Sequence, residues 1–341
     1  MHEAVASIGD QEFDRTDIVL VGFVDGSWPP FEGVVRAGLA CDRDAGGKVG
    51  VDDLRQAAVA FRRSLGLLAS DELDAWLEAR DLSRAALTAY LRRRALVEAH
   101  AGKLDEVVQR NPVSKDDVAT ILLAEAACDG IMRRCATTAV KWAGAPGDAG
   151  LGSSGPALAV AADVRRSAAS RFLELDDTEL AARIGSLLDL RAAFECWAAS
   201  VATEPAIAAC IDAHRMDWLR VDFVELDFDG DDAAREAAMC LREDGLEVGD
   251  VARTAGAALT ERSVILGAAD RSVASLLVAA QPGDVLGPMS AEGVTSRLLV
   301  VAGRRPPTGD DPAVVARARQ VLVAAALEPL VAGMVRWHAP L

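Results

Sequence analysis

The stretch from Asp42 to Asp53 has the acid spacing of a calcium-binding EF-hand loop. Aspartates occupy its positions 1, 3 and 12, glycine occupies position 6 and valine position 8. Ca²⁺ takes roughly six to eight oxygen ligands, and such a loop normally ends in a bidentate Glu rather than the shorter Asp. Three carboxylates favour a simpler interpretation, a glycine-rich turn in which an aspartate caps the next helix, and calcium binding stays the alternative.

A second acidic group stands at the end of a predicted strand: Asp227, Asp229, Asp231 and Asp232. Helix capping and pairing with a helix dipole explain this group better than a metal site. The four histidines have no partners at metal or triad spacing. The six cysteines lack C-x-x-C spacing, which favours buried free thiols over disulfides. The sequence therefore predicts no metal, no cofactor and no assigned catalytic residue.

Three consecutive arginines, Arg92 to Arg94, form a basic cluster within a predicted helix. Successive residues of a helix point in different directions, so the common outcome is a solvated face. The functional alternative is that these arginines bind an acidic leader peptide.

The chain of 341 residues carries 52 acidic and 36 basic side chains, a formal charge of −16. Such a field repels phosphate backbones and anionic membranes, so nucleic acid is not an expected partner. Met1 to Asp14 lacks the apolar core of a signal peptide, and Ile18 to Phe23 is too short to span a bilayer. We therefore expect a cytoplasmic protein without membrane contact.

The elements that must position these groups are mostly helical in the first half. Hydrophobic residues make up 51% of the chain but aromatic residues only 4%, which favours closely packed helices. A short strand is predicted over 17–24, with a turn at 25–27. Apolar periodicity predicts the helices 31–37, 51–65, 71–79, 84–100 and 114–142, and the glycine-rich residues 144–156 predict a linker.

In the second half of the chain, the spacing of apolar residues changes from helical to alternating. Helices are predicted over 157–172, 178–198 and 205–215, and alternating apolar residues then predict a strand at 219–228. Further helices are expected at 231–242, 247–255 and 272–280, and further strands at 263–266 and 296–301. A last helix is predicted over 311–336, interrupted near Pro329.

We therefore predict an α+β fold with five segments. They are a mainly helical N-terminal region with a short strand (1–143), a linker (144–156), a second helical region (157–217), a small α+β domain (218–305) and a C-terminal helix (306–341).

The order of elements in 218–305 resembles that of a parvulin-type peptidyl-prolyl isomerase. The residues that carry the resemblance are Thr254 to Gly256, Leu266-Gly267, Leu277, Pro282-Gly283-Asp284-Val285, Gly287-Pro288 and Leu298 to Val301. The whole chain is more loosely similar to the SurA-like group of parvulin proteins. That resemblance implies a helical chaperone-like region before the parvulin-like domain, and a C-terminal helix that packs back on the helical region.

Transferred residue by residue, none of the family's catalytic positions keeps the family's residue type. The first-strand histidine falls at Phe223, the last-strand histidine at Arg297, and the family's Cys or Asp falls within 257–260. The resemblance nevertheless implies a substrate cleft, whose predicted binding residues are Trp218, Phe223, Val278, Met289 and Arg297. Core packing is the alternative for Phe223 and Val278.

Prolyl isomerisation crosses a barrier of about 18–20 kcal/mol by twisting the imide, without a covalent intermediate. Lost polar residues therefore lower the expected rate more than they weaken peptide binding. The resemblance implies a chaperone-like protein that binds a peptide or unfolded segment, with a ribosomally made precursor peptide awaiting its modifying enzyme as one client. The alternatives are an active isomerase with a nonstandard site and a non-catalytic scaffold subunit of a biosynthetic enzyme complex.

Overall fold

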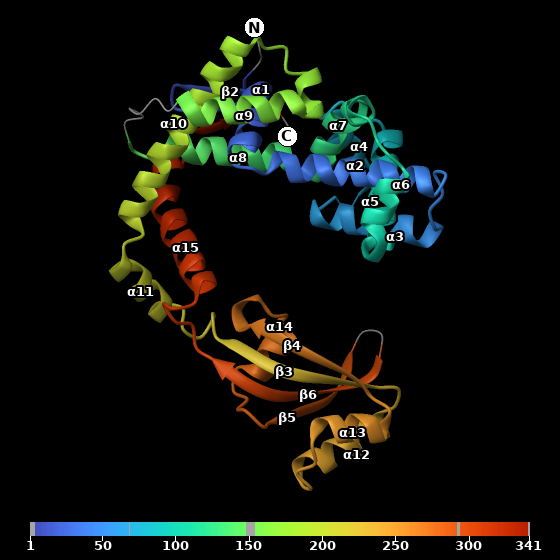
Figure 1. Ribbon diagram of the computed structural model, residues 1–341. Helices are drawn as coiled ribbons and strands as arrows, with labels where there is room; N and C mark the ends of the chain where they lie inside the picture. The colour runs from blue at the N-terminus through green and yellow to red at the C-terminus, as the bar shows by residue number, and fades with distance from the viewer. Residues whose placement is uncertain (1–3, 68, 148–153, 292–293, 340–341) are drawn as a thin grey trace. The chain divides into compact units, whose positions relative to one another are not determined.

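The computed structural model describes residues 4–67, 69–147, 154–291 and 294–339. Within these residues the protein is α+β, with many helices and two small antiparallel sheets of three and four strands. The chain divides into two compact units (Figure 1). The helical unit comprises Met1–Ala199 and Ala326–Leu341, and the sheet unit comprises Ser200–Ala325.

The helical unit contains a hairpin, a series of helices and one returning strand. Its elements are β1 (Ala4–Ile8), β2 (Gln11–Asp14), α1 (Arg15–Val24), α2 (Trp28–Asp44), α3 (Val51–Ser64), α4 (Ser70–Glu78), α5 (Arg84–Ala99), the 3-10 turn η1 (Ala101–Lys103), α6 (Leu104–Arg110), α7 (Lys115–Asp129), α8 (Ile131–Gly144), α9 (Ser154–Arg166), the 3-10 turn η2 (Ala168–Arg171), most of α10 (Asp177–Val201) and β7 (Val335–Trp337).

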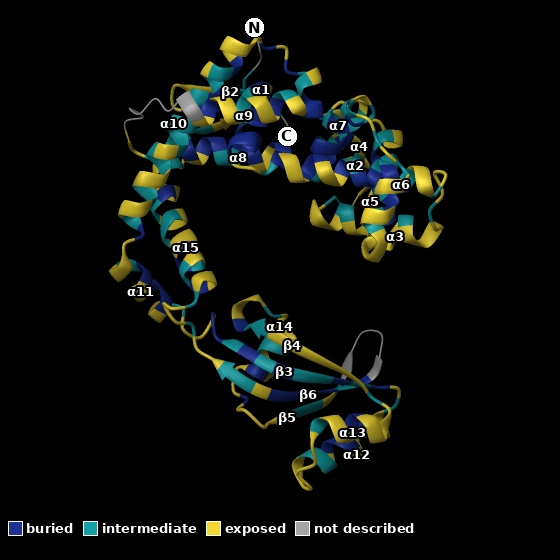
Figure 2. Ribbon diagram, in the orientation of Figure 1, coloured by how far each residue is buried: buried dark blue, intermediate teal, exposed yellow. Residues whose placement is uncertain are grey.

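Helix α1 occupies the segment for which the sequence predicted a strand at 17–24, so that prediction is wrong. The helix begins with a capping box: Asp17 N donates to Asp14 Oδ1 at 2.8 Å, and Asp14 N donates to Asp17 Oδ2 at 3.1 Å. The helix is buried along most of its length (Figure 2). A helix buried on every side is apolar all round, and its sequence then resembles that of a buried strand.

The core of the helical unit gathers around α1, α2, α7 and α8. Trp28, at the start of α2, is fully buried, and its ring lies 6.1 Å from that of Phe23 and 5.6 Å from that of Phe31. Gly22 on α1 permits this approach, because a Cβ there would lie 3.2 Å from Cε3 of the indole and 3.0 Å from Sγ of Cys135.

The C-terminal end of the chain completes the first sheet, in the order β2-β1-β7. β7 runs antiparallel to β1, with Ile8 opposite Val335, and Ser7 Oγ lies 2.8 Å from His338 Nε2. The last helix, α15 (Pro312–Val331), includes Pro329 and ends before the predicted residue 336. Gly333, at a φ of +76°, lies in the turn that replaces the end of the predicted helix.

The glycine-rich segment predicted as a linker between domains lies inside the helical unit. Helices on both sides of it supply the same core, through Trp142 on α8 and Val164 on α9. Residues 148–153 of this segment lie outside the described residues. The division between units instead follows Ala199, inside α10, where no glycine or proline marks it.

The sheet unit holds the second sheet. Its elements are α11 (Glu204–Ala213), β3 (Arg220–Phe228), α12 (Asp231–Arg242), α13 (Val248–Ala255), β4 (Ala258–Ile265), the 3-10 turn η3 (Leu266–Ala268), α14 (Arg271–Leu277), β5 (Val285–Ala291), β6 (Val294–Arg305) and the first part of α15. The strand order is β4-β3-β6-β5, antiparallel throughout, so the first and last strands lie side by side in the middle. β5 was not predicted from the sequence.

Each face of this sheet has its own apolar cluster, because successive side chains of β3 alternate between the faces. Val221 and Phe223 pack with Leu277 and Ala280 at the end of α14. Leu226 and Phe228 pack instead with α12 and α13. Figure 1 shows α14 on one side of the sheet and α12 with α13 on the other. A third cluster joins α11 to the first part of α15.

Among the described residues, no single helix has both the length and the apolar character needed to cross a membrane. Helices α1 and α2 satisfy the length and composition test only when taken together, and a bend of 98° separates them.

Candidate functional site

Three of the five predicted binding residues share one face of the four-stranded sheet. Arg297 on β6 lies directly opposite Met289 on β5 and Asp227 on β3. Phe223 and Asp227 lie four residues apart on β3, so their side chains point to the same face of the sheet. Phe223 also packs in the same cluster as Met289. Because α14 covers part of this surface, we call it the α14 face.

The other two predicted residues lie apart from that group. Val278 follows α14 and is 45% exposed, while its carbonyl accepts a hydrogen bond from Arg304 at 3.1 Å. Trp218 is buried in the cluster of α11 and α15, where its ring stacks on that of His214 at 4.6 Å. Of the five residues predicted to line one cleft, Phe223, Met289 and Arg297 therefore share the α14 face, whereas Trp218 and Val278 lie elsewhere.

An ion-pair network occupies the part of the α14 face beyond Phe223. The Arg297 guanidinium donates through Nε to Asp227 Oδ1 at 2.5 Å and through Nη2 to Oδ2 at 3.0 Å. Its Nη1 lies 3.7 Å from Glu225 Oε1, and Arg262 Nε donates to the other oxygen of Glu225 at 3.2 Å. The hydrogen bond from Arg297 to Asp227 raises the pKa of Arg297.

This network presents charged hydrogen-bonding groups but supplies no general acid or base. A guanidinium stays protonated at any working pH, and each carboxylate of the network is already paired with one. One thiol and one imidazole of the sheet unit, those of Cys210 and His214, lie 3.7 Å apart on and just after α11. Burial raises the pKa of Cys210, so that thiol is not an activated nucleophile.

Residues missed at the sequence level complete the α14 face: Glu225, Asp227 and Arg262. Asp227 was assigned to helix capping, whereas its carboxylate points across the sheet to Arg297. The alternation Phe223, Glu225, Asp227 along one strand indicates a shared face. That pattern would have identified the group once the pairing of β3 with β6 was known.

Strand β4 forms one edge of the sheet and pairs only with β3 in the described part of the chain. Its residues 258–263 are exposed (Figure 2). An edge strand of this kind presents backbone N–H and C=O groups to which another extended chain can add.

Trp218 borders a separate hollow of about 310 Å³. Arg317 lies over its ring, with the guanidinium carbon 5.3 Å from the ring centroid, and Arg220 and Pro306 also line the hollow. The predicted role of Trp218 in binding stays a prediction here, at a site different from the α14 face.

The EF-hand-like stretch does not form an acid-lined loop. Asp42 and Asp44 belong to the last turn of α2, and Asp42 accepts two hydrogen bonds of 2.8 Å from Arg92. Asp44 accepts one from Asn111 at 2.9 Å. In the described part of the chain, no group of three or more His, Cys, Asp or Glu side chains is arranged to hold a metal ion.

The three consecutive arginines are not an open anion site. Arg92 is paired with Asp42, Arg93 is buried with Glu125, and Arg94 lies 3.4 Å from a carboxylate oxygen of Asp129. Arg92 therefore joins α5 to α2, Arg93 and Arg94 both join it to α7, and the proposed acidic leader peptide would have to displace these pairs.

Asp222 offers a pH test of the sheet next to Phe223. Two hydrogen bonds from Arg305, of 2.9 and 2.8 Å, and one from Ser263 lower the pKa of the Asp222 carboxyl. A lowered folded-state pKa contributes stability above the ordinary value of 3.8 and loses it as the pH falls through the folded value. We expect a carboxyl NMR titration to place Asp222 below 3.8 and Arg305→Gln to raise it. An unchanged midpoint in Arg305→Gln would contradict this assignment.

No family model matches the chain, and no curated protein matches it at a significant level. A functional assignment therefore depends on the α14 face, on the exposed β4 edge and on the resemblance of residues 218–305 to the parvulin order of elements. These features favour binding over covalent chemistry.

Proposed function

We propose that this protein binds extended peptide segments through a parvulin-like domain in which an ion-pair network replaces the catalytic polar side chains. The order β3, α12, α13, β4, α14, β5, β6 supports the parvulin-like assignment. So does the pairing of the first and last strands, which brings the two positions that the resemblance gives to histidines onto one face.

The single observation that carries the proposal is what surrounds Phe223 and Arg297, the two positions that the resemblance gives to histidines. Phe223 is 3% exposed and packs in the apolar cluster under α14. Arg297 is bound by Asp227 and Glu225. Neither group can exchange a proton with an imide nitrogen, whereas the apolar and charged halves of the face together suit a chain with mixed side chains.

The mode of binding we propose is strand addition at β4. Main-chain hydrogen bonds to the exposed edge would supply affinity independent of sequence, and the adjacent α14 face would select side chains. This mode needs no reactive residue, so it tolerates the loss of the family's histidines. A precursor peptide awaiting modification is one client with the required extended conformation.

The test measures isomerisation and binding separately. In a protease-coupled assay with a chromogenic Ala-Leu-Pro-Phe peptide, we expect the cis-to-trans rate to stay within about twofold of the uncatalysed rate. The same peptide without the chromophore is expected to shift the amide NMR signals of β4 and the methyl signal of Met289.

Acceleration that Phe223→Leu or Arg297→Gln abolishes would overturn the proposal and favour the active isomerase. Arg253→Gln is the matched control, because it removes a charge on α13 that pairs with Asp250 one helical turn away. A protein that binds a modifying enzyme but shifts no β4 signal with any peptide would instead favour the scaffold function.

A further inference from the structure

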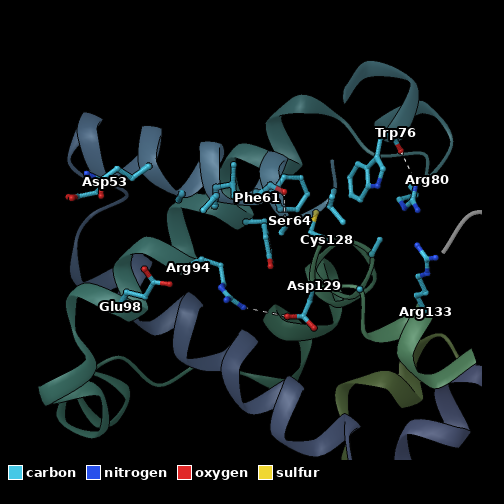
Figure 3. Close-up of a pocket in the computed structure, with 18 residues that line it drawn as sticks. Asp53, Phe61, Ser64, Trp76, Arg80, Arg94, Glu98, Cys128, Asp129 and Arg133 are labelled. Atoms are coloured by element: carbon cyan, nitrogen blue, oxygen red, sulfur yellow. Dashed lines mark hydrogen bonds and ion pairs between the residues drawn. The ribbon is translucent and has the colours of Figure 1, made fainter. Parts of the chain in front are cut away.

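A cavity of about 680 Å³ lies among α3, α4, α5 and the junction of α7 with α8, within the helical unit (Figure 3). Ligand-binding pockets measure roughly 300–1,000 Å³, so this volume suits a ligand the size of a few side chains. None of the predicted binding residues lines it. Its chemistry is set by an aromatic wall and by charges at its two ends.

The aromatic wall consists of Phe61 on α3, Trp76 on α4 and Tyr90 on α5. Phe61 makes edge-to-face contacts with both partners, with its ring centroid 5.4 Å from that of Trp76 and 6.1 Å from that of Tyr90. Such edge-to-face contacts hold the rings in a fixed arrangement. Cys128 lies beside them, and burial raises its pKa to about 12, so the thiol stays neutral and forms part of an apolar lining.

Two arginines give one end of the cavity a positive field. The Arg80 guanidinium carbon lies 4.4 Å from the centre of the Trp76 ring, and Nη1 donates to Trp76 O at 3.3 Å. These contacts fix the position of the cation. Burial, and then the charge of Arg133, lower the pKa of Arg80. Both guanidinium groups therefore act on the same volume.

The lining of the cavity also contains three carboxylates. Asp129 lines the cavity, but it is bound by Arg94 at 3.4 Å and also by Arg134. The other two acids of the lining, Asp53 and Glu98, lie at the opposite side of the cavity from Arg80 and Arg133, as Figure 3 shows. An anion entering beside the aromatic wall would meet two cations and no free acid among the described lining residues.

We propose that this cavity binds a peptide segment in which an acidic residue stands next to a large apolar residue. The apolar side chain lies against Phe61, Trp76 and Tyr90, and the carboxylate sits between Arg80 and Arg133. A carboxylate there relieves the repulsion between the two cations and forms charge-assisted hydrogen bonds. This inference rests on the proposed function, because it takes the ligand to be a peptide.

The test uses the full chain and fluorescein-labelled peptides of sequence Gly-Ser-Leu-Phe-X-Leu-Ser-Gly, in which X is Asp, Asn or Lys. We expect fluorescence anisotropy to show that the Asp peptide binds about tenfold more tightly than the Asn peptide. Arg133→Gln is expected to remove that preference, and Arg133→Glu to reverse it in favour of the Lys peptide. Arg133 is exposed, so neither change disturbs the core.

Arg63→Gln is the matched control. It removes the same charge from an exposed position on α3, but Arg63 does not line the cavity, so the preference for Asp should persist. An Asp preference that survives Arg133→Gln would overturn the inference. Binding of 3-phenylpropionate to the cavity, with no binding of the Asp peptide, would overturn the assignment to a peptide.

The two proposals fail separately. If the peptides bind and shift only β4 and Met289, the cavity inference is overturned and the proposed function stands. If Arg133→Gln abolishes the Asp preference while no peptide shifts β4, the proposed function is overturned at the sheet and the cavity inference stands. Arg297→Gln, on the α14 face, should leave the Asp preference unchanged.

Discussion

Replacing Trp28 with alanine is expected to lower the free energy of unfolding of the helical unit by about 3–5 kcal/mol. The side chain is fully buried between the rings of Phe23 and Phe31. Gly22 brings the backbone of α1 against the indole, so little of the cavity left by truncation can be refilled by a small shift. Urea unfolding followed by far-ultraviolet circular dichroism measures the loss.

Trp28→Phe is the matched control. Nε1 of Trp28 is buried and has no hydrogen-bond partner among the residues that the structure describes, so phenylalanine removes an unsatisfied donor along with some volume. We expect this variant to lose less than about half as much stability as Trp28→Ala. Equal losses for the two variants would contradict this expectation, because phenylalanine would then recover none of the packing of the indole.

Arg93→Met is expected to destabilise the helical unit by about 3–5 kcal/mol, because it leaves the carboxylate of Glu125 buried without its cation. Both side chains are buried, and Arg93 Nε donates to Glu125 Oε1 at 2.8 Å. Burial raises the pKa of Glu125 from its ordinary value of 4.5, and the Arg93 charge opposes that shift. Without Arg93, the pKa of Glu125 should rise further.

The sign of the pH dependence follows from that shift. A carboxyl whose folded-state pKa is raised contributes most stability below its ordinary value of 4.5 and loses it as the pH rises through the folded value. The loss caused by Arg93→Met should therefore be smaller at acidic than at neutral pH. Unfolding free energies of the wild type and of Arg93→Met, measured at acidic and at neutral pH, test this prediction.

The double variant Arg93→Met/Glu125→Leu is the control for the buried ion pair. We expect it to be more stable than Arg93→Met alone, because no charge stays buried without a partner. A double variant as unstable as the single one, with no dependence on pH, would show that packing by the long Arg93 side chain matters more than its charge.

The amphipathic helices could be predicted from the sequence, since one apolar stripe and a capping residue define such an element. Ser83 and Ser114 begin α5 and α7 as expected, each accepting a hydrogen bond from the backbone three residues later. The strand predicted at 17–24 was wrong because Ile18 to Val24 is buried on all sides. All of these residues are therefore apolar or small, and no helical spacing of apolar residues can be recognised. Asp14 and Asp17, three residues apart, were the available signal for a helix.

The sites were harder to predict because their members are distant in sequence. Arg80 follows α4 and Arg133 lies on α8, and only the packing of helices brings both to one cavity. The network on the α14 face depends on the pairing of Asp227 with Arg297, which lie 70 residues apart. A resemblance identified Phe223 and Arg297 as positions of interest, but the partners that change their chemistry became visible only in the sheet.

The pairing of β1 with β7 constrains how the protein is made. Ser7 and His338, which lie 331 positions apart, are hydrogen-bonded where the ends of the chain meet. A ribosome adding ~5–20 residues per second needs about 20–60 s between them. During that time β1 lacks the partner strand that β7 later supplies, while Ser200–Ala325 is a continuous segment that emerges whole. The sheet unit can thus mature first, although its coding sequence starts later.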